Sequence, residues 1–323
     1  MNEPSQKLVS IIMPAYNVEK YVGQALEAIL RQTYAHIEII AVNDGSTDKT
    51  RRILLEYAGR DKRLSVIDQP NRGLSAARNA GFAAAKGEYL CIIDSDDLML
   101  PQKIESHFGF LEQHRTADIA YSRLYLFVDG TTRLYTRSLR TPDDAHIFTT
   151  LLQHGNFISP NTVFFRRSVL DRFGGFDENL RACEDIDYWL SLSQKGANFL
   201  FQDEYLTLGR MRKGSLTTDG VLIYSTLVTV FEKYIVRSSN AFLTYLKYPY
   251  YLRSRLLLWI SKIRKSRSEG KNVAAEARQS AVSMFADTFF SLLYKMKFRL
   301  TFKKARTASV RNFLAAIQSL STT

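Results

Sequence analysis

The chain has 323 residues, 46% of them hydrophobic, so it can bury one large or two modest domains, and a largely disordered chain is excluded. Its two cysteines, Cys91 and Cys183, exclude a disulfide framework and a thiolate metal site and fit a reducing compartment. The formal charge of +12 comes from residues 221–323, which hold 18 Lys and Arg against 4 Asp and Glu, whereas residues 1–220 hold 26 against 28.

Targeting signals are not apparent in the sequence. The first ten residues lack the basic segment and apolar core of a secretory signal, and no window reaches the roughly 18 to 20 uncharged apolar residues that span a bilayer. We therefore expect a cytoplasmic protein, with any membrane association peripheral.

The first hundred residues alternate between two kinds of pattern. Short runs that are apolar on both faces predict buried parallel strands at residues 8–13, 37–42, 64–67 and 89–93. Apolar residues at helical spacing predict helices at residues 22–30 and 53–58, and a third helix with Ser75 as its N-cap and Gly87 just past its end. This alternation predicts an α/β fold with right-handed crossovers and a sheet covered on both faces.

After Pro101 the pattern becomes mixed. We expect short strands near residues 117–128 and 162–166 and a helix over residues 185–195. From Val221 onward the sequence reads as several basic helices, and a soft boundary precedes them at residues 214–220.

Polar and acidic residues follow three of the predicted strands. They occupy residues 14–17, 43–48 and 94–97, and the carboxyl ends of parallel strands meet at one edge of a sheet. No glycine-rich phosphate loop follows the first strand, so phosphates need another binder. Asp94 and Asp96 are spaced to hold a hard divalent cation whose other ligands would be phosphate oxygens and water.

These segments give the chain a resemblance to glycosyltransferase family 2. The residues that carry it are Val9–Asn17, Asn43–Asp48, Asn71–Asn79, Asp94–Asp97, Gly174–Glu178 and Glu184–Leu190. The resemblance covers about residues 7–216. It implies the GT-A fold, a Rossmann-like, mostly parallel sheet flanked by helices, together with an inverting mechanism and a UDP-sugar donor. The expected regions are a nucleotide-sugar-binding half at 1–105, an acceptor-binding half at 106–216 and a helical extension at 217–323.

The resemblance also implies roles for individual residues. Asp185 would be the catalytic general base, with Glu184 as the fallback, and Asp96 would hold Mn²⁺ or Mg²⁺ with Asp94 alongside. The donor-binding residues would be Pro14, Ala15, Tyr16, Asn17, Asp44, Gly45, Ser46, Arg72, Arg78, Asp94, Ser95, Asp96, Arg210 and Arg212. Among these, Asp44 would bond the uracil, and Arg72 or Arg78 would approach the nucleobase or diphosphate.

The segment Gly209–Ser215 departs from the family pattern Tyr-Arg-x-His-x-x-Ser. Arg212 stands where the family usually has the histidine, and a guanidinium does not ligate a metal as an imidazole does. Arg212 is instead suited to pair with phosphate.

Simpler structural interpretations exist for several of these residues. Residues 43–46 fit a turn with a helix cap, Glu184 and Asp185 fit helix caps, and Tyr16 and Trp189 fit the core. The histidines share no spacing and are expected at the surface or in caps; they are His36, His107, His114, His146 and His154. The sequence is also compatible with an oligomer.

Three classes of function are weighed. The leading one is transfer of a hexose or N-acetylhexosamine to a growing polysaccharide or lipid-linked glycan. The alternative is a catalytically silent nucleotide-sugar or carbohydrate-binding module. Nucleic-acid binding is not expected, because the basic C-terminal region lacks a recognition motif and the acidic strand ends would repel a phosphate backbone.

The basic C-terminal region interleaves aromatic and aliphatic with cationic side chains. They are Tyr245, Tyr248, Tyr250, Tyr251, Leu252, Leu256, Leu257, Leu258 and Trp259 with Lys247, Arg253, Arg255, Lys262, Arg264, Lys265 and Arg267. This pattern is typical of helices that lie on an anionic membrane. It also fits helices that pack on the catalytic domain or on a second subunit.

Overall fold

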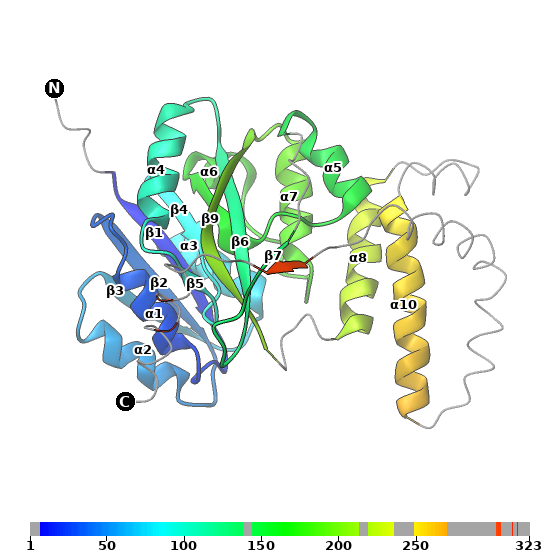
Figure 1. The fold of residues 1–323 in the computed structure, drawn as a ribbon, viewed down its shortest axis with the longest axis horizontal. Coiled ribbons are helices and arrows are strands. Elements are labelled where there is room, and N and C mark those ends of the chain that lie inside the picture. The colour runs from blue at the N-terminus through cyan, green and yellow to red at the C-terminus, as the bar shows by residue number, and fades with distance from the viewer. Residues whose placement is uncertain are drawn as a thin grey trace.

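The computed structural model describes residues 7–137, 144–212, 219–235, 249–269 and 302–304, with residues 312 and 315. A central sheet is covered by helices on both faces (Figure 1). Its first half alternates strand and helix in the order β1 (Val9–Ala15), α1 (Val22–Leu30), β2 (Ile37–Asp44), α2 (Thr50–Ala58), β3 (Leu64–Gln69), α3 (Leu74–Ala84) and β4 (Tyr89–Ile92). Every residue of β1 is buried, as expected of a strand apolar on both faces.

The strand order places the polar loops at one edge. Strands β4, β1, β2 and β3 lie side by side and are parallel, with Ala15 of β1 beside Asn43 of β2. The segments after β1, β2 and β4 therefore leave the sheet at the same edge, as the sequence predicts.

The second half of the chain extends the sheet with mixed strands. Its elements are β5 (Leu98–Met99), α4 (Lys103–Gln113), β6 (Ile119–Val128), β7 (Leu134–Arg137), the 3₁₀ turn η1 (Asp144–His146), α5 (Ile147–His154), η2 (Pro160–Thr162), β8 (Val163–Arg166), α6 (Ser168–Phe173), α7 (Glu184–Gln194) and β9 (Phe199–Met211). β8 joins β4 antiparallel, and β6 joins β8 antiparallel and β9 parallel. The expected short strand near 117–128 is thus one ten-residue strand.

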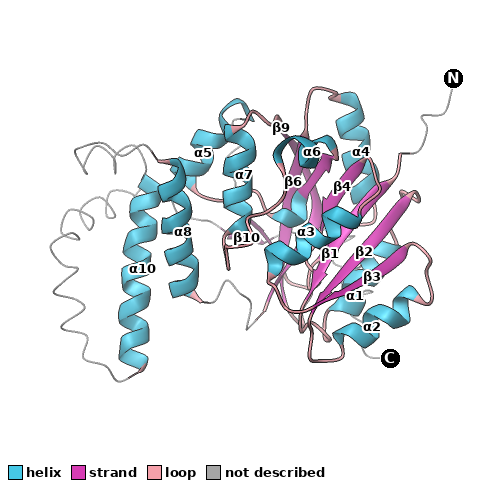
Figure 2. Ribbon diagram, turned by 180° about the vertical axis from the view of Figure 1, so that it is seen from behind, coloured by secondary structure: helices cyan, strands magenta, loops and turns pink. Residues whose placement is uncertain are grey.

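The two faces of the sheet carry different helices. Side chains of α1, α2 and α4 share one buried cluster with the strands, including Leu26, Leu54 and Ile104. The opposite cluster contains side chains of α3, α5, α6 and α7, including Phe82 and Trp189. Figure 2 shows the face that α3 covers. Trp189 is buried, as predicted from its helical spacing.

Two sequence expectations are wrong. Ser75 is not the N-cap of α3: the cap position is Gly73, at φ 94°, and Ser75 is buried in the first turn. The helix ends at Ala84, and a Cβ on Gly87 would lie 2.7 Å from the Leu8 carbonyl oxygen. His107 is not a surface residue but is fully buried and stacked on Phe164, and burial lowers its pKa to about 3.

The C-terminal helices α8 (Gly220–Tyr234) and α10 (Pro249–Ser268) lie side by side (Figures 1 and 2). Leu227, Val230 and Phe231 of α8 belong to the same buried cluster as Trp189. Short β10 (Phe302–Lys304) pairs with β7. Within the described ranges, no helix combines the length and the hydropathy that a membrane span requires.

Some sequence expectations concern residues outside the described ones. These are the soft boundary at residues 214–218, the loop residues Lys213–Ser215, and Tyr245, Lys247 and Tyr248 of the basic region. The side chains of Leu252, Arg264 and Arg267 also lie outside them.

Candidate active site

The loops after β1 and β2 are joined by their side chains. The backbone N–H of Asn17 donates to Ser46 Oγ at 3.1 Å, and the N–H of Thr47 donates to Asn17 Oδ1 at 2.8 Å. Gly45, at φ 71°, carries no side chain because a Cβ would lie 2.6 Å from Asn71 N. Pro14 and Ala15 are buried at the end of β1.

Tyr16 directly follows the last residue of β1 and is exposed. Its side chain is 49% exposed, so it is not part of the core. Exposed large apolar side chains are few among the described residues. An exposed aromatic ring beside the polar loops is available to a ligand such as a nucleobase.

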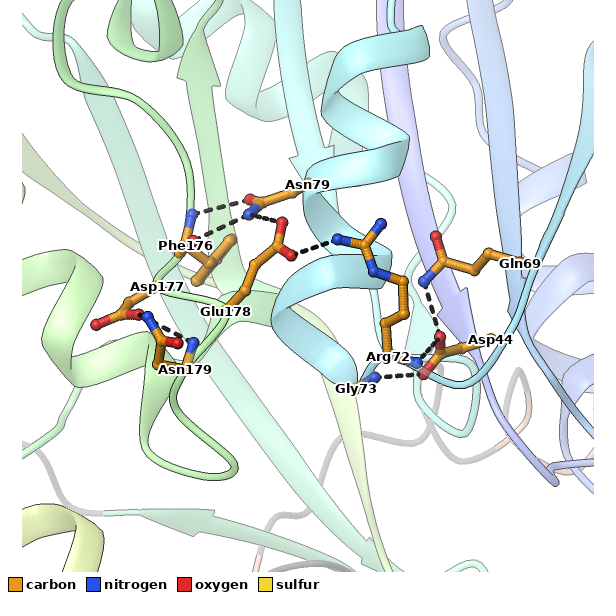
Figure 3. A network of polar contacts seen from close by, with 9 residues as sticks. All are labelled: Asp44, Gln69, Arg72, Gly73, Asn79, Phe176, Asp177, Glu178 and Asn179. Atoms are coloured by element: carbon orange, nitrogen blue, oxygen red, sulfur yellow. Dashed lines mark hydrogen bonds and ion pairs between the residues drawn. The ribbon is translucent and has the colours of Figure 1, made fainter.

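Asp44 anchors the loop that leads into α3 (Figure 3). Its carboxylate accepts hydrogen bonds from the backbone N–H groups of Arg72 at 2.8 Å and Gly73 at 2.9 Å, and from Gln69 Nε2 at 2.7 Å. Asp44 thus satisfies backbone donors next to the helix start, the task expected of Ser75. Two carboxylate oxygens offer about four acceptor positions, so one remains for a ligand donor.

Two motifs that are about a hundred residues apart in the chain meet beside this loop. The Asn79 side chain accepts from the N–H of Phe176 and donates to its carbonyl, both at 2.9 Å, and also donates to Glu178 at 3.0 Å. Glu178 then pairs with the Arg72 guanidinium at 2.8 Å. Figure 3 shows this chain of contacts from Asp44 to the 176–179 loop. The preceding Gly175 has to lack a side chain, because a Cβ there would overlap Asn79.

Arg78 is buried between two acidic segments. Its side chain is 1% exposed and pairs with Asp94 at 2.9 Å and Glu184 at 2.5 Å, and its guanidinium lies over the Phe176 ring. Although burial opposes the charge, these two carboxylates raise the pKa of Arg78 above its usual value. In this structure Arg78 therefore joins the metal-binding candidate Asp94 to the start of α7, and its contact with a donor stays a prediction.

The acidic segment after β4 is organised by a residue that the sequence did not single out. Asn161 of η2 accepts from the N–H of Asp94 at 2.6 Å and donates to the Asp94 carboxylate at 3.0 Å and to Asp97 at 2.5 Å. Below it, buried Lys103 donates to the Asn161 carbonyl. Burial and the neighbouring carboxylates raise the pKa of Asp96, and raise that of Asp97 well above its usual range.

Arg210 of β9 is fully engaged by the protein. Its backbone N–H donates to Asp97, and its guanidinium contacts the Asp96 carbonyl, Asp129 and Gln24, each at 2.7 Å. Arg210 braces the acidic segment, and its role in donor binding stays a prediction.

Arg212 lies at the exposed side of the same segment. Its Nε pairs with Asp96 Oδ2 at 2.7 Å, and its guanidinium lies over the Tyr21 ring. Both members of the pair are partly exposed. The residue at the usual histidine position is thus in direct contact with the predicted metal ligand.

The carboxylate oxygens after β4 fit a hard divalent cation that a second molecule helps to hold. Asp94 and Asp96 supply carboxylate oxygens, they lie close enough for the charge of Asp94 to raise the pKa of Asp96, and Ser95 between them is buried. Among the described residues, no group of three His, Cys, Asp or Glu side chains is placed to hold a metal ion. The described residues therefore offer two carboxylate groups to such a cation.

Asp185 and Glu184 begin α7 but have different surroundings. Glu184 is buried against Arg78. Asp185 is partly buried, accepts from Asn156 Nδ2 at 2.6 Å and from the N–H of Ile186 at 2.8 Å, and has no cation partner among its hydrogen bonds. Burial, and then the charge of Glu184, raises the pKa of Asp185 to about 7. Asp185 is thus suited to accept a proton near neutral pH.

The sequence of the chain is similar to those of known glycosyltransferases. A family model described as Glycosyl transferase family 2 matches residues 10–174. The uncharacterized glycosyltransferase EpsJ of Bacillus subtilis is 34% identical over 65% of this chain, which spans 63% of that relative's length. An uncharacterized glycosyltransferase of Haemophilus influenzae is 32% identical over 68% of this chain and 84% of its own length.

Solved structures confirm the predicted GT-A fold. Residues 1–349 of TarS from S. aureus, solved with UDP-GlcNAc, align with a TM-score of 0.57 at 20% identity, over 77% of this chain and 72% of that one. The mannosyltransferase PcManGT from Pyrobaculum calidifontis, solved with GDP-Man and Mn²⁺, aligns with a TM-score of 0.56 at 17% identity, over 97% and 86%. At these identities the likeness concerns the fold.

Proposed function

Because the chain belongs to glycosyl transferase family 2, we propose that it is an inverting enzyme that moves a hexose or N-acetylhexosamine from a UDP-sugar to a growing polysaccharide or lipid-linked glycan. The observation that carries the proposal is the Arg78 bridge, because it ties the cation-binding candidate Asp94 to the helix that begins with Glu184 and Asp185. With these two parts joined, the diphosphate and the general base would act on the same sugar ring. We infer that this takes place in the cytoplasm.

The nucleoside would bind at the ends of β1 and β2. Its ring would lie against exposed Tyr16, beside Pro14 and Ala15, and an N–H of the base would donate to the acceptor position that Asp44 retains. The loops joined by Asn17 and Ser46, with Gly45 between β2 and Ser46, would border the bound nucleoside. Arg72, anchored at its backbone and exposed at its guanidinium, would reach toward the nucleobase or diphosphate.

The diphosphate would bind at Asp94 and Asp96. When bound, Mn²⁺ or Mg²⁺ would neutralise the charge that develops on the leaving diphosphate. Arg212 would exchange its Asp96 contact for a phosphate oxygen, since its fork of donors matches either anion. Arg78, Arg210 and Asn161 would keep the acidic segment in place.

The chemical step is a single displacement. The acceptor hydroxyl oxygen forms a bond to the anomeric carbon, and the bond from that carbon to the diphosphate oxygen breaks with its electron pair. The hydroxyl proton passes to the Asp185 carboxylate. Because the attack comes opposite the leaving group, the anomeric configuration inverts. Glu184 is the weaker candidate for the base because its carboxylate is already paired with Arg78.

A silent binding module would need no general base. A partly buried Asp185 with a pKa raised to about 7 costs folding stability, which a module that only binds would have no reason to bear. The candidate cation ligands Asp94 and Asp96 are present as well. These features favour the enzymatic proposal.

Donor hydrolysis tests the proposal without a known acceptor. The purified protein is incubated with UDP-, GDP- and dTDP-sugars, with Mn²⁺, Mg²⁺ or a chelator, and nucleotide release is measured. We expect metal-dependent release from a UDP-sugar. Binding of a nucleotide sugar without any turnover would favour the silent module.

A further inference from the structure

Three acidic residues in the first turn of α7 are each held by a different part of the protein. Glu184 is held by Arg78 of α3, Asp185 by Asn156 of the loop after α5, and Asp187 by helix α8. The α8 contact comes from the region that the sequence analysis separated from the catalytic halves. The turn that carries the candidate base is therefore supported from three directions.

Lys233 of α8 makes two of these contacts at once. Its Nζ lies 2.9 Å from Asp177 Oδ2, in the 176–179 loop, and 3.1 Å from Asp187 Oδ1. The neighbouring Tyr234 hydroxyl lies 3.2 Å from both the carbonyl and the carboxylate of Asp187. Burial alone would lower the pKa of Lys233, but its bonds to the two carboxylates raise it, so the lysine is charged in this position.

Helix α8 is a firm support for these contacts. Leu227, Val230 and Phe231 pack in the same buried cluster as α7, and the Cys183 thiol, just ahead of α7, contacts the Ile223 carbonyl at 3.5 Å. Asp219 caps the helix by accepting from two of its first N–H groups. Lys233 therefore projects from a helix that is packed and capped, and such a lysine can hold its partners in place.

We propose that Lys233 is a positioning residue for the general base: by joining Asp187 of α7 to Asp177 of the 176–179 loop, it sets the orientation of Asp185. This inference rests on the proposed function. It makes α8 part of the catalytic unit instead of an appendage to it. Lys233 touches no reacting atom, so its effect is expected in turnover and not in donor binding.

Removing Lys233 would leave a buried charge without its cation. The Asp187 side chain is only 8% exposed, so its carboxylate would keep the Tyr234 hydroxyl as a partner but lose the positive charge that balances it. The first turn of α7 can relieve this by turning Asp187 toward solvent, and the same rotation moves Asp185, two residues earlier. A displacement of about 1 Å at a catalytic group can cost about 100-fold in rate.

A double-mutant cycle on donor hydrolysis tests the proposal. The rates of UDP release are compared for wild type, Lys233→Met, Asp185→Asn and the double variant, at saturating UDP-sugar with Mn²⁺. We expect Lys233→Met to lower kcat by about 10- to 100-fold with the donor KM within about twofold, and to have almost no further effect when Asp185 is already Asn. Lys233→Arg should recover most of the rate.

Matched variants separate positioning from general stability. Tyr251→Phe removes the bond from the Tyr251 hydroxyl to Glu232, which joins α10 to α8, and should leave kcat unchanged. Should Lys233→Met fail to fold, Tyr234→Phe replaces it, and it should lower kcat without changing the donor KM.

Three outcomes overturn the inference: an unchanged kcat in Lys233→Met, an equal loss in the Asp185→Asn background, or a similar loss in Tyr251→Phe. A wild-type protein that releases no nucleotide from any donor contradicts the proposed function itself, and this inference with it.

Discussion

Asp185 and Glu184 are adjacent carboxylates with different partners. Glu184 is paired with Arg78, whereas Asp185 accepts from the neutral amide of Asn156, and burial raises the pKa of Asp185 to about 7. The dipole of α7 favours an ionised carboxylate at this helix end, but burial and the charge of Glu184 outweigh that stabilisation and raise the pKa of Asp185.

The raised pKa of Asp185 predicts a pH-dependent stability. Its ordinary value is 3.8 and its folded value is about 7, so the folded state holds the proton more tightly, and this contribution to stability is lost as pH rises from about 4 to 7. We expect Asp185→Asn to raise Tm at pH 8 and to change it little at pH 4. Thermal unfolding at both pH values checks this, and an equal effect at the two would contradict the raised pKa.

Asp96 is the residue on which metal-dependent binding should depend. Asp96→Ala removes one of two proposed carboxylate ligands and leaves Arg212 without its partner. We expect UDP affinity in the presence of Mn²⁺ to fall to the level measured without metal. Calorimetric titration of UDP with and without Mn²⁺ measures this, with Asp171→Ala on α6 as the control. An unchanged metal effect in a folded Asp96→Ala protein would rule out this ligand.

At the scale of elements, what depends on local pattern was predictable and what depends on distant partners was not. The apolar runs correctly indicated β1 to β4 because a strand buried on both faces leaves a continuous signal. The start of α3 was predicted wrongly because Asp44, about thirty residues earlier, fills the capping role assigned to Ser75. A prediction from the cap preferences of neighbouring residues does not take such a distant carboxylate into account.

The site shows the same division. The motifs indicated Asp94, Asp96 and Asp185, but not the two asparagines that hydrogen-bond Asp94 and Asp185. Asn161 in η2 and Asn156 in the loop after α5 belong to no recognisable pattern, and their partners are about 67 and 29 residues away. Only the approach of β8 to β4 and of α5 to α7 brings them into contact.

Two helix glycines give opposite predictions for the same substitution. Ala is favoured over Gly in a helix by about 1 kcal/mol. A Cβ on Gly109 of α4 meets nothing within 4 Å, so Gly109→Ala should stabilise the protein by about 0.5–1 kcal/mol. A Cβ on Gly81 of α3 would overlap Ile12 of β1, and overpacking of about 1–3 kcal/mol outweighs the propensity gain. Urea unfolding of both variants measures the signs, and stabilisation by Gly81→Ala would show that α3 packs less closely on β1.

At the scale of the whole molecule, the described part of the basic aromatic stretch forms helix α10. This helix packs on α8 and α5, as the packing interpretation of that stretch expected, whereas its association with a membrane stays a prediction. Helix α10 contacts α8 through buried Tyr251 and presents exposed Lys262 and Lys265. We propose that these lysines lie against an anionic membrane where a lipid-linked acceptor would be held.

Vesicle binding tests this placement. Each basic residue near an anionic surface contributes about 1 kcal/mol. We expect salt-sensitive co-sedimentation with anionic vesicles, reduced at least about tenfold by Lys262→Glu with Lys265→Glu. The matched control reverses the charges of the exposed Lys62, between α2 and β3, and Lys86, between α3 and β4. Equal losses in both double variants would indicate net charge instead of a binding face, and no binding to any vesicle would refute the proposal.

The most direct measurement is the pH dependence of UDP release at saturating UDP-sugar, for wild type and for Asp185→Asn. We expect a wild-type rate that rises with pH to a plateau with a midpoint at about 7, as Asp185 loses its proton. In Asp185→Asn we expect a rate lower by about two to four orders of magnitude, with UDP affinity retained. A wild-type rate independent of pH between about 5 and 9, or a near-normal rate in Asp185→Asn, would contradict Asp185 as the general base.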